Sequence, residues 1–213
     1  MKGMEMNYLD LLTERYPALV RERDNILGLY EVLVRCYENG GKLLIAGNGG
    51  SAADAEHITG ELMKGFMKKR EVPAETAAAF RAVDPAVGDL LTANLQRGLP
   101  AICLSCHEAL NTAFMNDCNP DLFFAQQVYG YGRPGDVFLG ISTSGNSKNV
   151  LYAATAAKAL GLTVTGLLGR DGGKLLPLCD AAVVVPEQET FKIQELHLPV
   201  YHAVCQMLEE HFF

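Results

Sequence analysis

The chain has 213 residues, of which 49% are hydrophobic and 20% are charged, a composition that supports a packed core and excludes intrinsic disorder. Eighteen Lys and Arg stand against 25 Asp and Glu, giving a formal net charge of −7. This balance argues against nonspecific nucleic-acid binding, which needs a basic face, but it permits a small anionic ligand held by backbone amides.

The cysteines and the N-terminal sequence favour a cytoplasmic protein with reduced thiols. The six cysteines are not needed as disulfides in a chain of this length, and the N-terminus lacks the apolar run of a signal peptide. No run of about 18 apolar residues occurs, so we expect no membrane-spanning helix. Residues 103–107 match the c-type haem attachment pattern, but residues 99–105 read as a buried strand and we reject haem.

Helical periodicity opens the chain. Apolar residues recur at spacings of three and four over residues 5–38, which predicts helix in two pieces that meet near Pro17. Asn39-Gly40-Gly41 supplies the C-terminal stop. The apolar stripe suits packing on the chain's own core or against another subunit, and the sequence leaves both open.

From Gly41 onward, short apolar runs alternate with helical segments. We expect strands at 42–46, 99–105, 136–141, 162–167 and 181–185, and helices at 51–68, 119–131, 148–160 and 187–213. Strands separated by helices indicate a parallel sheet covered on both faces. The prediction is therefore an α/β protein, a three-layer αβα sandwich with a five-stranded parallel sheet in one domain spanning residues 1–213.

Residues 70–97 do not fit this alternation. The segment carries Pro73 and Asp84-Pro85, with a helix expected from Pro85 to Gln96. It lies between a helix and the next strand, where an excursion is tolerated. A lid, a packing element and an oligomer contact are all compatible with it, and a plain surface insertion is favoured.

Two strand–helix turns could bind phosphate. Residues 47–51 (Gly-Asn-Gly-Gly-Ser) follow the first strand, but they match neither the dinucleotide-binding nor the Walker pattern. Residues 142–147 (Ser-Thr-Ser-Gly-Asn-Ser) place four hydroxyls before a helix, whereas capping needs one. Both turns lie at the carboxyl ends of strands, where open α/β sheets bind ligands. Together they favour phosphate binding over simple structural turns.

Two helices carry titratable residues that could act on a substrate or bind a metal. His57 and Glu61 are four apart, so imidazole and carboxylate share one helix face. Near the C-terminus, Gln194 is angularly close to both His197 and His202, and the spacing alone does not select which histidine works with it. Pro199 is expected to kink this helix.

These residues carry a family resemblance. The segments 47–57 with Glu61, 133–136, 141–147, 169–173 and 193–197 resemble the phosphoheptose isomerases, which share the flavodoxin-like SIS (sugar isomerase) fold. The resemblance runs from about Met6 to the end of the chain, apart from the excursion. It implies an aldose–ketose isomerase acting on sedoheptulose 7-phosphate through an enediol, and a homotetramer in which residues 5–40 serve assembly.

The resemblance also implies roles for individual residues. Glu61 and His202 would be the base and acid, and zinc would be held by His57, Glu61, Gln194 and His202, which makes His197 a packing residue. The residues matching the sugar-phosphate contacts are Asn48, Gly49, Gly50, Ser51, Glu61, Asn116, Asp117, Ser142, Thr143, Ser144, Ser147 and Gln194.

Three features depart from the family pattern, one of which is the excursion at residues 70–97, placed where it could cover or reshape the sugar pocket. Met63-Lys-Gly-Phe66 replaces a basic Gly-Arg-Tyr run, and Phe191 stands where an acidic or small residue is usual. Two alternatives therefore accompany the isomerase interpretation. One is a non-catalytic SIS protein that binds phosphosugars or associates with a replication initiator, and the other is an isomerase of a different phosphorylated ketose.

Overall fold

Five parallel strands form the centre of the computed structural model, which describes residues 2–213 and, for side chains, residues from Tyr8 onward. The strands lie in the order β2-β1-β3-β4-β5. This is the flavodoxin-like order, in which β2 is added on one side of β1 and the later strands on the other, so that the switch point lies between β1 and β3. Their bounds are β1 Leu43–Ala46, β2 Ala101–Cys103, β3 Val137–Ser142, β4 Thr163–Leu168 and β5 Ala181–Val184.

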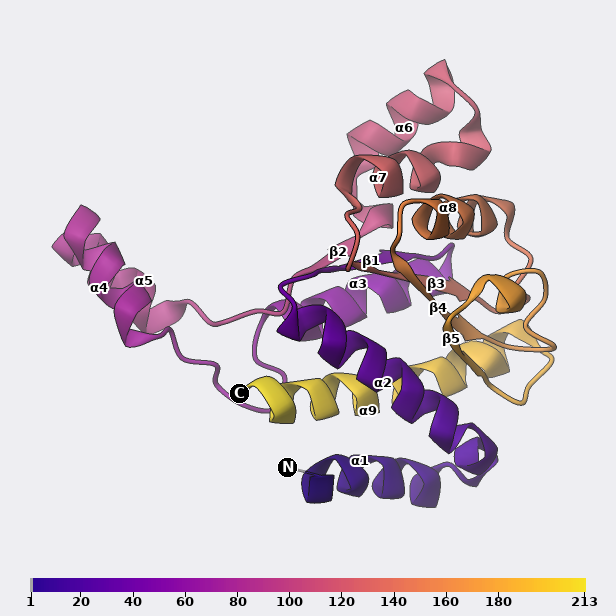
Figure 1. The fold of residues 1–213 in the computed structure, drawn as a ribbon, viewed down its shortest axis with the longest axis horizontal. Helices are drawn as coiled ribbons and strands as arrows, with labels where there is room; N and C mark the ends of the chain where they lie inside the picture. The colour runs from indigo at the N-terminus through magenta and orange to yellow at the C-terminus, as the bar shows by residue number, and fades with distance from the viewer. Residues whose placement is uncertain (1) are drawn as a thin grey trace.

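Helices cover both faces of the sheet, as predicted for a three-layer α/β sandwich (Figure 1). One face carries α1 (Lys2–Arg15), α2 (Arg23–Glu38), α3 (Gly50–Met63) and α9 (Thr190–Phe212). The other carries α6 (Glu108–Asp117), α7 (Phe123–Tyr131) and α8 (Lys148–Ala159). Successive strand residues point to opposite sides, so Leu43 and Ile45 enter the first core while Leu44 and Ala46 enter the second.

The N-terminal segment breaks near Pro17, as predicted. A 3-10 helix, η1 (Pro17–Glu22), separates α1 from α2, because proline cannot donate the amide that would continue α1. The expected stripe is largely buried, including Leu9, Leu19 and Ile26. The helix stops after Glu38, where Gly40 adopts a φ of +73°.

Two short helices lie outside the sequence prediction. α4 (Ala74–Val83) precedes the expected helix, now α5 (Pro85–Asn94), and α6 follows β2 directly after η2 (Leu104–Cys106). Each buries a single residue in its own span, Ala77 in α4 and Asn111 in α6. With so little apolar surface turned inward, neither segment shows the periodicity on which the prediction relied.

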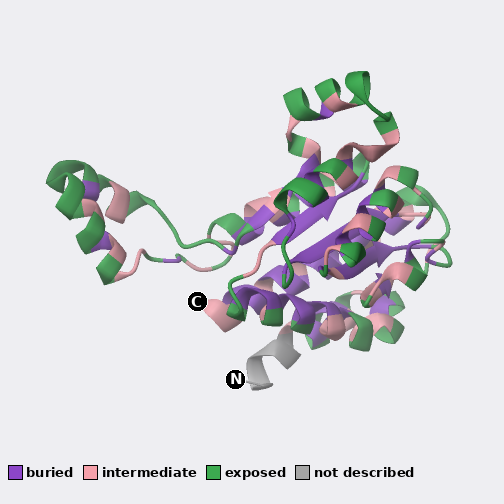
Figure 2. Cartoon of the chain, turned by 45° about the horizontal axis from the view of Figure 1, so that its top comes forward, coloured by how far each residue is buried: buried purple, intermediate pink, exposed green. Residues whose placement is uncertain are grey.

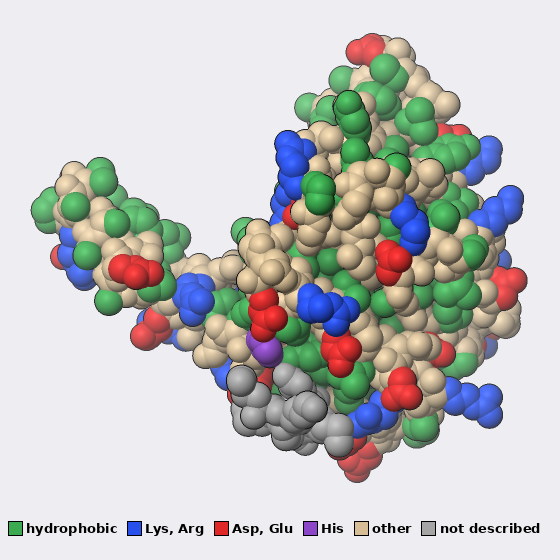
Figure 3. All heavy atoms as spheres, in the orientation of Figure 1, with side chains coloured by type: hydrophobic (Ala, Val, Ile, Leu, Met, Phe, Trp, Pro, Cys, Tyr) green, Lys and Arg blue, Asp and Glu red, His purple; other side chains and the backbone are tan. Residues whose placement is uncertain are grey.

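The excursion is a helical hairpin that leaves the body of the molecule. In Figure 1, α4 and α5 pack on each other and project beyond the sheet and its helices. Most of the hairpin is exposed (Figure 2), and Figure 3 shows apolar side chains gathered on it. Val83 is 90% exposed and Leu90 63%.

Two polar residues fix where the sheet begins. The Asp136 carboxylate accepts from the Lys42 backbone amide at 3.0 Å and from Lys42 Nζ at 2.6 Å, and it also accepts from the Arg133 amide at 2.8 Å. The starts of β1 and β3 are thereby tied together.

Two smaller 3-10 turns, η3 (Pro120–Leu122) and η4 (Leu176–Leu178), complete the described elements. Within residues 2–213, none of the helices combines the length and apolar character needed to cross a membrane.

Candidate active site

Helices α3 and α9 pack side by side and run in the same direction, which brings the two sets of titratable residues together. Near the start of α3, a Cβ on Gly50 would overlap the side-chain amide of Gln194. Seven residues further along, the rings of His57 and His202 meet edge to face with their centroids 4.9 Å apart. The absence of a side chain at Gly50 therefore allows the close approach of the two helices at this end.

His57, Glu61 and His202 form one cluster. His57 Nε2 lies 3.4 Å from Glu61 Oε1, as expected for residues one turn apart. The side chain of His57 is 42% exposed, whereas that of Glu61 is 12% exposed. Lys64 places its Nζ 3.5 Å from the other Glu61 oxygen. Burial, with His57 as the next contributor, lowers the pKa of His202, so this imidazole is neutral at pH 7.

Two buried atoms of this cluster have no hydrogen-bond partner within the described part of the chain. They are Glu61 Oε2 and His202 Nε2. Buried polar atoms are nearly always paired in folded proteins, so unpaired ones indicate a ligand, an ion or water. Nitrogen and carboxylate oxygen are donors that zinc accepts. Among the side chains that the structure describes, from Tyr8 onward, however, no three of His, Cys, Asp or Glu are grouped closely enough to hold a metal ion.

A hydrogen-bond chain behind His57 places a proton on its Nδ1 atom. The Tyr201 hydroxyl donates to Asp54 Oδ1 at 3.3 Å and lies 3.0 Å from His57 Nδ1. Because its one proton is directed at Asp54, Tyr201 accepts from the Nδ1–H of His57. Nε2 on the other side of the ring faces Glu61 Oε1 at 3.4 Å, where a proton or a cation between the two atoms would satisfy both.

Asp54 and Tyr201 were not among the sequence-predicted site residues. Burial raises the pKa of Asp54 to about 6, although the bond from Tyr201 opposes this shift. Their sequence positions carried a usable signal, since Asp54 lies one turn before His57 on α3 and Tyr201 precedes His202. Phe66, at one of the positions that depart from the family pattern, packs against His202 with ring centroids 5.4 Å apart.

His202 also borders an open hollow of about 260 Å³ between α1 and α9. Its walls combine apolar side chains with Arg15. The members that lie on α1 or directly follow it are Tyr8, Leu11, Leu12, Arg15 and Tyr16, and those on α9 are Leu198, Pro199, His202, Ala203 and Gln206. The cluster is thus reachable from the surface beside the N-terminal helix.

The glycine-rich turn after β1 presents backbone rather than side chains. Asn48, Gly49 and Gly50 are exposed, and Gly49 has a φ of +57° that favours glycine. Ser51 is buried in the first turn of α3. The turn faces the N-terminus of α3, where free amides and the helix dipole attract an anion.

A pair of amides joins this turn to the serine-rich one. Asn48 and Asn149 exchange two hydrogen bonds, each of 2.9 Å. Asn149 lies in the first turn of α8, which the serine-rich turn enters. The two predicted phosphate-binding turns are therefore neighbours, as their places at the ends of adjacent strands β1 and β3 require. The sequence analysis did not single out Asn149, because an Asn in the first turn of a helix is usually exposed to solvent.

The serine-rich turn is held open by its own contacts. Ser142 Oγ lies 3.1 Å from Ser147 Oγ, and Ser144 Oγ accepts from the Asn146 amide at 3.2 Å. Thr143 is partly exposed between them. Gly145 has a φ of +64°, and a Cβ there would overlap the carbonyl oxygen of Gly172. The glycine-rich segment 169–173 thus supports this turn from outside.

Three sequence-predicted residues lie apart from the His57 cluster. Gln194 lies against Gly50, eight residues or about 12 Å along α9 from His202. Asn116 and Asp117 end α6, where both are exposed and the Asn116 amide donates to Asp117 at 3.0 Å. In Figure 1, α6 lies on the opposite side of the sheet from α9. Their roles in metal or sugar binding stay predictions.

His197 is a buried packing residue, and α9 runs through Pro199 without ending. His197 Nε2 donates to the Leu168 carbonyl at 3.1 Å, and burial lowers its pKa to about 4. Because the unfolded chain has the ordinary pKa near 6.5, the unfolded state binds more protons between these values. Stability is therefore expected to fall as pH drops from 6.5 towards 4.

The expected size of this effect is up to about 3 kcal/mol. Urea unfolding between pH 4 and 7.5 measures how the free energy of unfolding depends on pH. In His197→Gln, which lacks the titrating imidazole, the contribution of His197 to this pH dependence should disappear. An equally steep pH dependence in His197→Gln would assign the effect to other groups.

Comparisons with known proteins agree with this arrangement. A sequence profile of the SIS domain matches residues 7–95 and 77–169. A phosphoheptose isomerase from Nitratiruptor sp. is 42% identical over 187 residues, which is 86% of each chain.

Two solved structures share the fold. A phosphoheptose isomerase from Neisseria gonorrhoeae superposes with a TM-score of 0.71 at 33% identity, covering 98% of this chain and 94% of that one. One from Francisella tularensis superposes with a TM-score of 0.72 at 29% identity, covering 95% and 98%. The profile match and the identity over most of both chains lead to one conclusion: the chain belongs to the phosphoheptose isomerase family of SIS-domain proteins.

Proposed function

We propose that this protein is an aldose–ketose isomerase that converts sedoheptulose 7-phosphate into D-glycero-D-manno-heptose 7-phosphate. The observation that carries the proposal is the cluster of His57, Glu61 and His202 on two helices that also border a glycine-rich turn, with His57 3.4 Å from Glu61 and its ring packed on that of His202. Relatives that match most of the chain are named phosphoheptose isomerases, which supplies the substrate.

The reaction needs a base and an acid on one face of the sugar. It moves a proton between adjacent carbons through an enediol, so a carboxylate must accept the carbon-bound proton and a second group must protonate the carbonyl oxygen. Glu61 has the carboxylate, whose buried Oε2 makes no hydrogen bond and has the Lys64 ammonium 3.5 Å away. His202, whose Nε2 is likewise unoccupied, is the group to exchange the proton with oxygen.

The phosphate has a separate place to bind. Ser142, Thr143, Ser144 and Ser147 offer hydroxyls at the start of α8, and the amides of Gly49, Gly50 and Ser51 begin α3. Both helix N-termini favour an anion through their dipoles. A net charge of −7 is therefore compatible with a phosphorylated substrate.

The donor atoms of the cluster are of the kinds that zinc accepts, although as they lie no three described His, Cys, Asp or Glu side chains are grouped closely enough to hold a metal ion. His57, Glu61 and His202 supply nitrogen and oxygen donors, two of them with unpaired buried atoms. Gln194, from the start of α9, would complete the set only if the side chains drew together, because it lies about 12 Å along the helix from His202. When bound, zinc would polarise the sugar carbonyl and orient its hydroxyls. Tyr201 and Asp54 hold His57 in the tautomer whose Nε2 is free to bind a cation.

The proposal is tested by metal analysis of the purified protein followed by an isomerase assay on sedoheptulose 7-phosphate. We expect one zinc per chain and turnover that a chelator removes and zinc restores. Turnover without metal would overturn the zinc assignment alone. A metal-free protein that binds the sugar phosphate without converting it would instead favour a phosphosugar-binding function. Turnover of a different phosphorylated ketose would correct the substrate.

Gly145→Ala is expected to weaken phosphate binding. The added Cβ meets the Gly172 carbonyl and the positive φ is strained, at a cost of about 1–3 kcal/mol, so the serine-rich turn must shift. We expect KM to rise by about tenfold or more, with a parallel loss of competitive inhibition by inorganic phosphate. Gly130→Ala is the matched control, since it lies in α7 with open space around it. An unchanged KM in Gly145→Ala would remove this turn from the binding site.

We also propose that the protein assembles as a homotetramer in the cytoplasm. The hollow between α1 and α9, lined by both polar and apolar side chains, together with exposed Leu11 and Val20, offers surface for another subunit beside the cluster. All six cysteines are free, which suits a reducing compartment. Light scattering on the eluting protein measures the assembly, and a monomer at micromolar concentration would contradict it.

A further inference from the structure

A fully buried arginine lies just beyond the helix that carries Glu61. Arg70 has no exposed side-chain surface, and its partner Glu209 is 2% exposed. Burying a guanidinium is costly unless every donor finds a partner, so the contacts of Arg70 indicate what it stabilises.

Arg70 reaches the last turn of α3 as well as Glu209. Its Nε donates to Glu209 Oε1 at 2.9 Å, its Nη1 donates to the Leu62 carbonyl at 2.6 Å, and its Nη2 donates to the Glu61 carbonyl at 2.9 Å. Because α3 ends at Met63, these carbonyls lack partners within the helix. Arg70 thus caps the helix, and its charge complements the negative end of the dipole.

Glu209 holds the chain that follows. Its two oxygens accept from the backbone amides of Phe66, Met67 and Lys68 at 2.7–3.1 Å. Burial alone would raise the pKa of Glu209, but these amides and Arg70 together hold it below its ordinary value. The carboxylate is therefore ionised at neutral pH, and it fixes Phe66, whose ring packs against His202.

The position of the Glu61 carboxylate depends on this backbone. Its Oε2 is buried without a hydrogen bond, and its polar neighbours are His57 at 3.4 Å and Lys64 at 3.5 Å. Since few contacts hold the carboxylate itself, the last turn of α3 determines where it lies. Arg70 holds this last turn of the helix through its hydrogen bonds to the Leu62 and Glu61 carbonyls.

The geometry points to Arg70 as a positioning residue for Glu61, acting through the two carbonyls at the end of α3 and through Glu209. This inference rests on the proposed role of Glu61 as the base. Arg70 does not touch the reacting atoms. It sets the distance between the Glu61 carboxylate and the two histidines, and Glu209 sets the place of Phe66 beside His202.

The test is Arg70→Lys, which keeps the charge but cannot bridge three acceptors with a planar fork. We expect kcat to fall by about 10- to 100-fold, as for other changes that displace a reacting group, while KM changes by less than about threefold because the phosphate-binding turns are untouched. Arg97→Lys is the matched control. Arg97 stacks on Phe213 as Arg70 does, but within the described residues its side chain donates no hydrogen bond to a carbonyl of α3.

Two further measurements separate positioning from simple stabilisation. In a Glu61→Gln background, Arg70→Lys should cause no further loss of residual turnover, since it acts through a group already removed. Hydrogen exchange of residues 58–68 should accelerate in Arg70→Lys and not in Arg97→Lys. This second readout needs no turnover, so it separates failure of this inference from failure of the proposed function. The inference would be overturned if Arg70→Lys left the hydrogen exchange of residues 58–68 unchanged, or if its effect added to that of Glu61→Gln. A normal kcat for Arg70→Lys, where the wild-type protein is active, would overturn it as well.

Discussion

Glu61→Gln is expected to lower kcat by about 10²–10⁴-fold, the range that a general base contributes. The amide has the shape of the carboxylate but cannot accept the proton from the sugar carbon. KM should change little, because Glu61 lies near the end of α3 whereas the glycine-rich turn lies at its start, and the serine-rich turn follows β3. The measurement is turnover of sedoheptulose 7-phosphate together with incorporation of solvent deuterium at the carbon that exchanges its proton.

The control is Glu56→Gln on the same helix, where the side chain is exposed and five residues away. It should leave both rates unchanged. His202→Ala should also abolish turnover while the protein stays folded. Near-normal turnover in both Glu61→Gln and His202→Ala, with unchanged thermal unfolding, would remove the base and the acid from the mechanism.

Glu209→Ala is expected to destabilise the protein by about 3–5 kcal/mol, the cost of leaving a buried charge without its partner. The variant strands the Arg70 guanidinium and also deprives three backbone amides of their acceptor. Denaturant unfolding at pH 7 measures the loss. A shift of this size lies near the total stability of many domains, so low expression of the variant is part of the expected result.

Glu210→Ala provides the comparison at the adjacent position. Glu210 pairs with Lys68 at 2.6 Å, but Lys68 is 38% exposed, and an ion pair open to water contributes under about 1 kcal/mol. Equal losses in the two variants would show that burial of the Arg70–Glu209 pair does not decide the outcome.

The fold followed from sequence wherever apolar periodicity was strong. All five strands lie within two residues of their predicted starts, because buried parallel strands are short continuous apolar runs. The helix after β1 was predicted to reach Lys68 and ends at Met63. The helix ends early because of a tertiary contact: the backbone amides of Phe66 to Lys68 donate to Glu209 instead of to helix carbonyls. Glu209 lies about 140 residues later in the sequence, so the local sequence pattern does not predict this contact.

The candidate site divides in the same way. His57 and Glu61 share a helix face by spacing alone, and the structure confirms their contact. The choice of His202 over His197 could not come from spacing, because both histidines are angularly close to Gln194 around the axis of α9. It follows from packing, which places His202 on the ring of His57 and directs His197 into the core. The sequence places Asp54 one turn before His57 and Tyr201 next to His202, but their hydrogen bond to each other forms only because α3 and α9 pack side by side.

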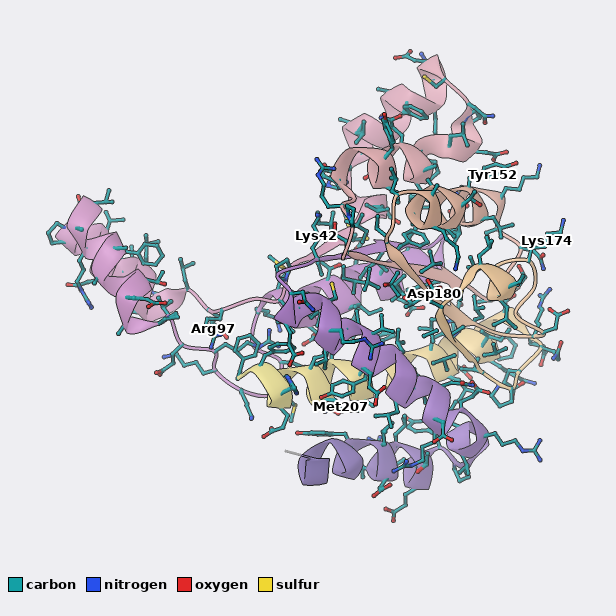
Figure 4. The ribbon with its side chains drawn as sticks, viewed as in Figure 1. Lys42, Arg97, Tyr152, Lys174, Asp180 and Met207 are labelled. Carbon is teal, nitrogen blue, oxygen red and sulfur yellow. The ribbon has the colours of Figure 1, made fainter. Side chains whose placement is uncertain are left out.

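The two ends of the helical hairpin meet at a single point. The Arg97 amide donates to the Arg70 carbonyl at 2.9 Å, and Figure 4 shows Arg97 beside the C-terminal end of α9. An insertion whose ends already touch closes without strain on the rest of the chain. We therefore expect that the hairpin can be replaced by a short linker while the sheet, the Arg70–Glu209 pair and Glu61 keep their places.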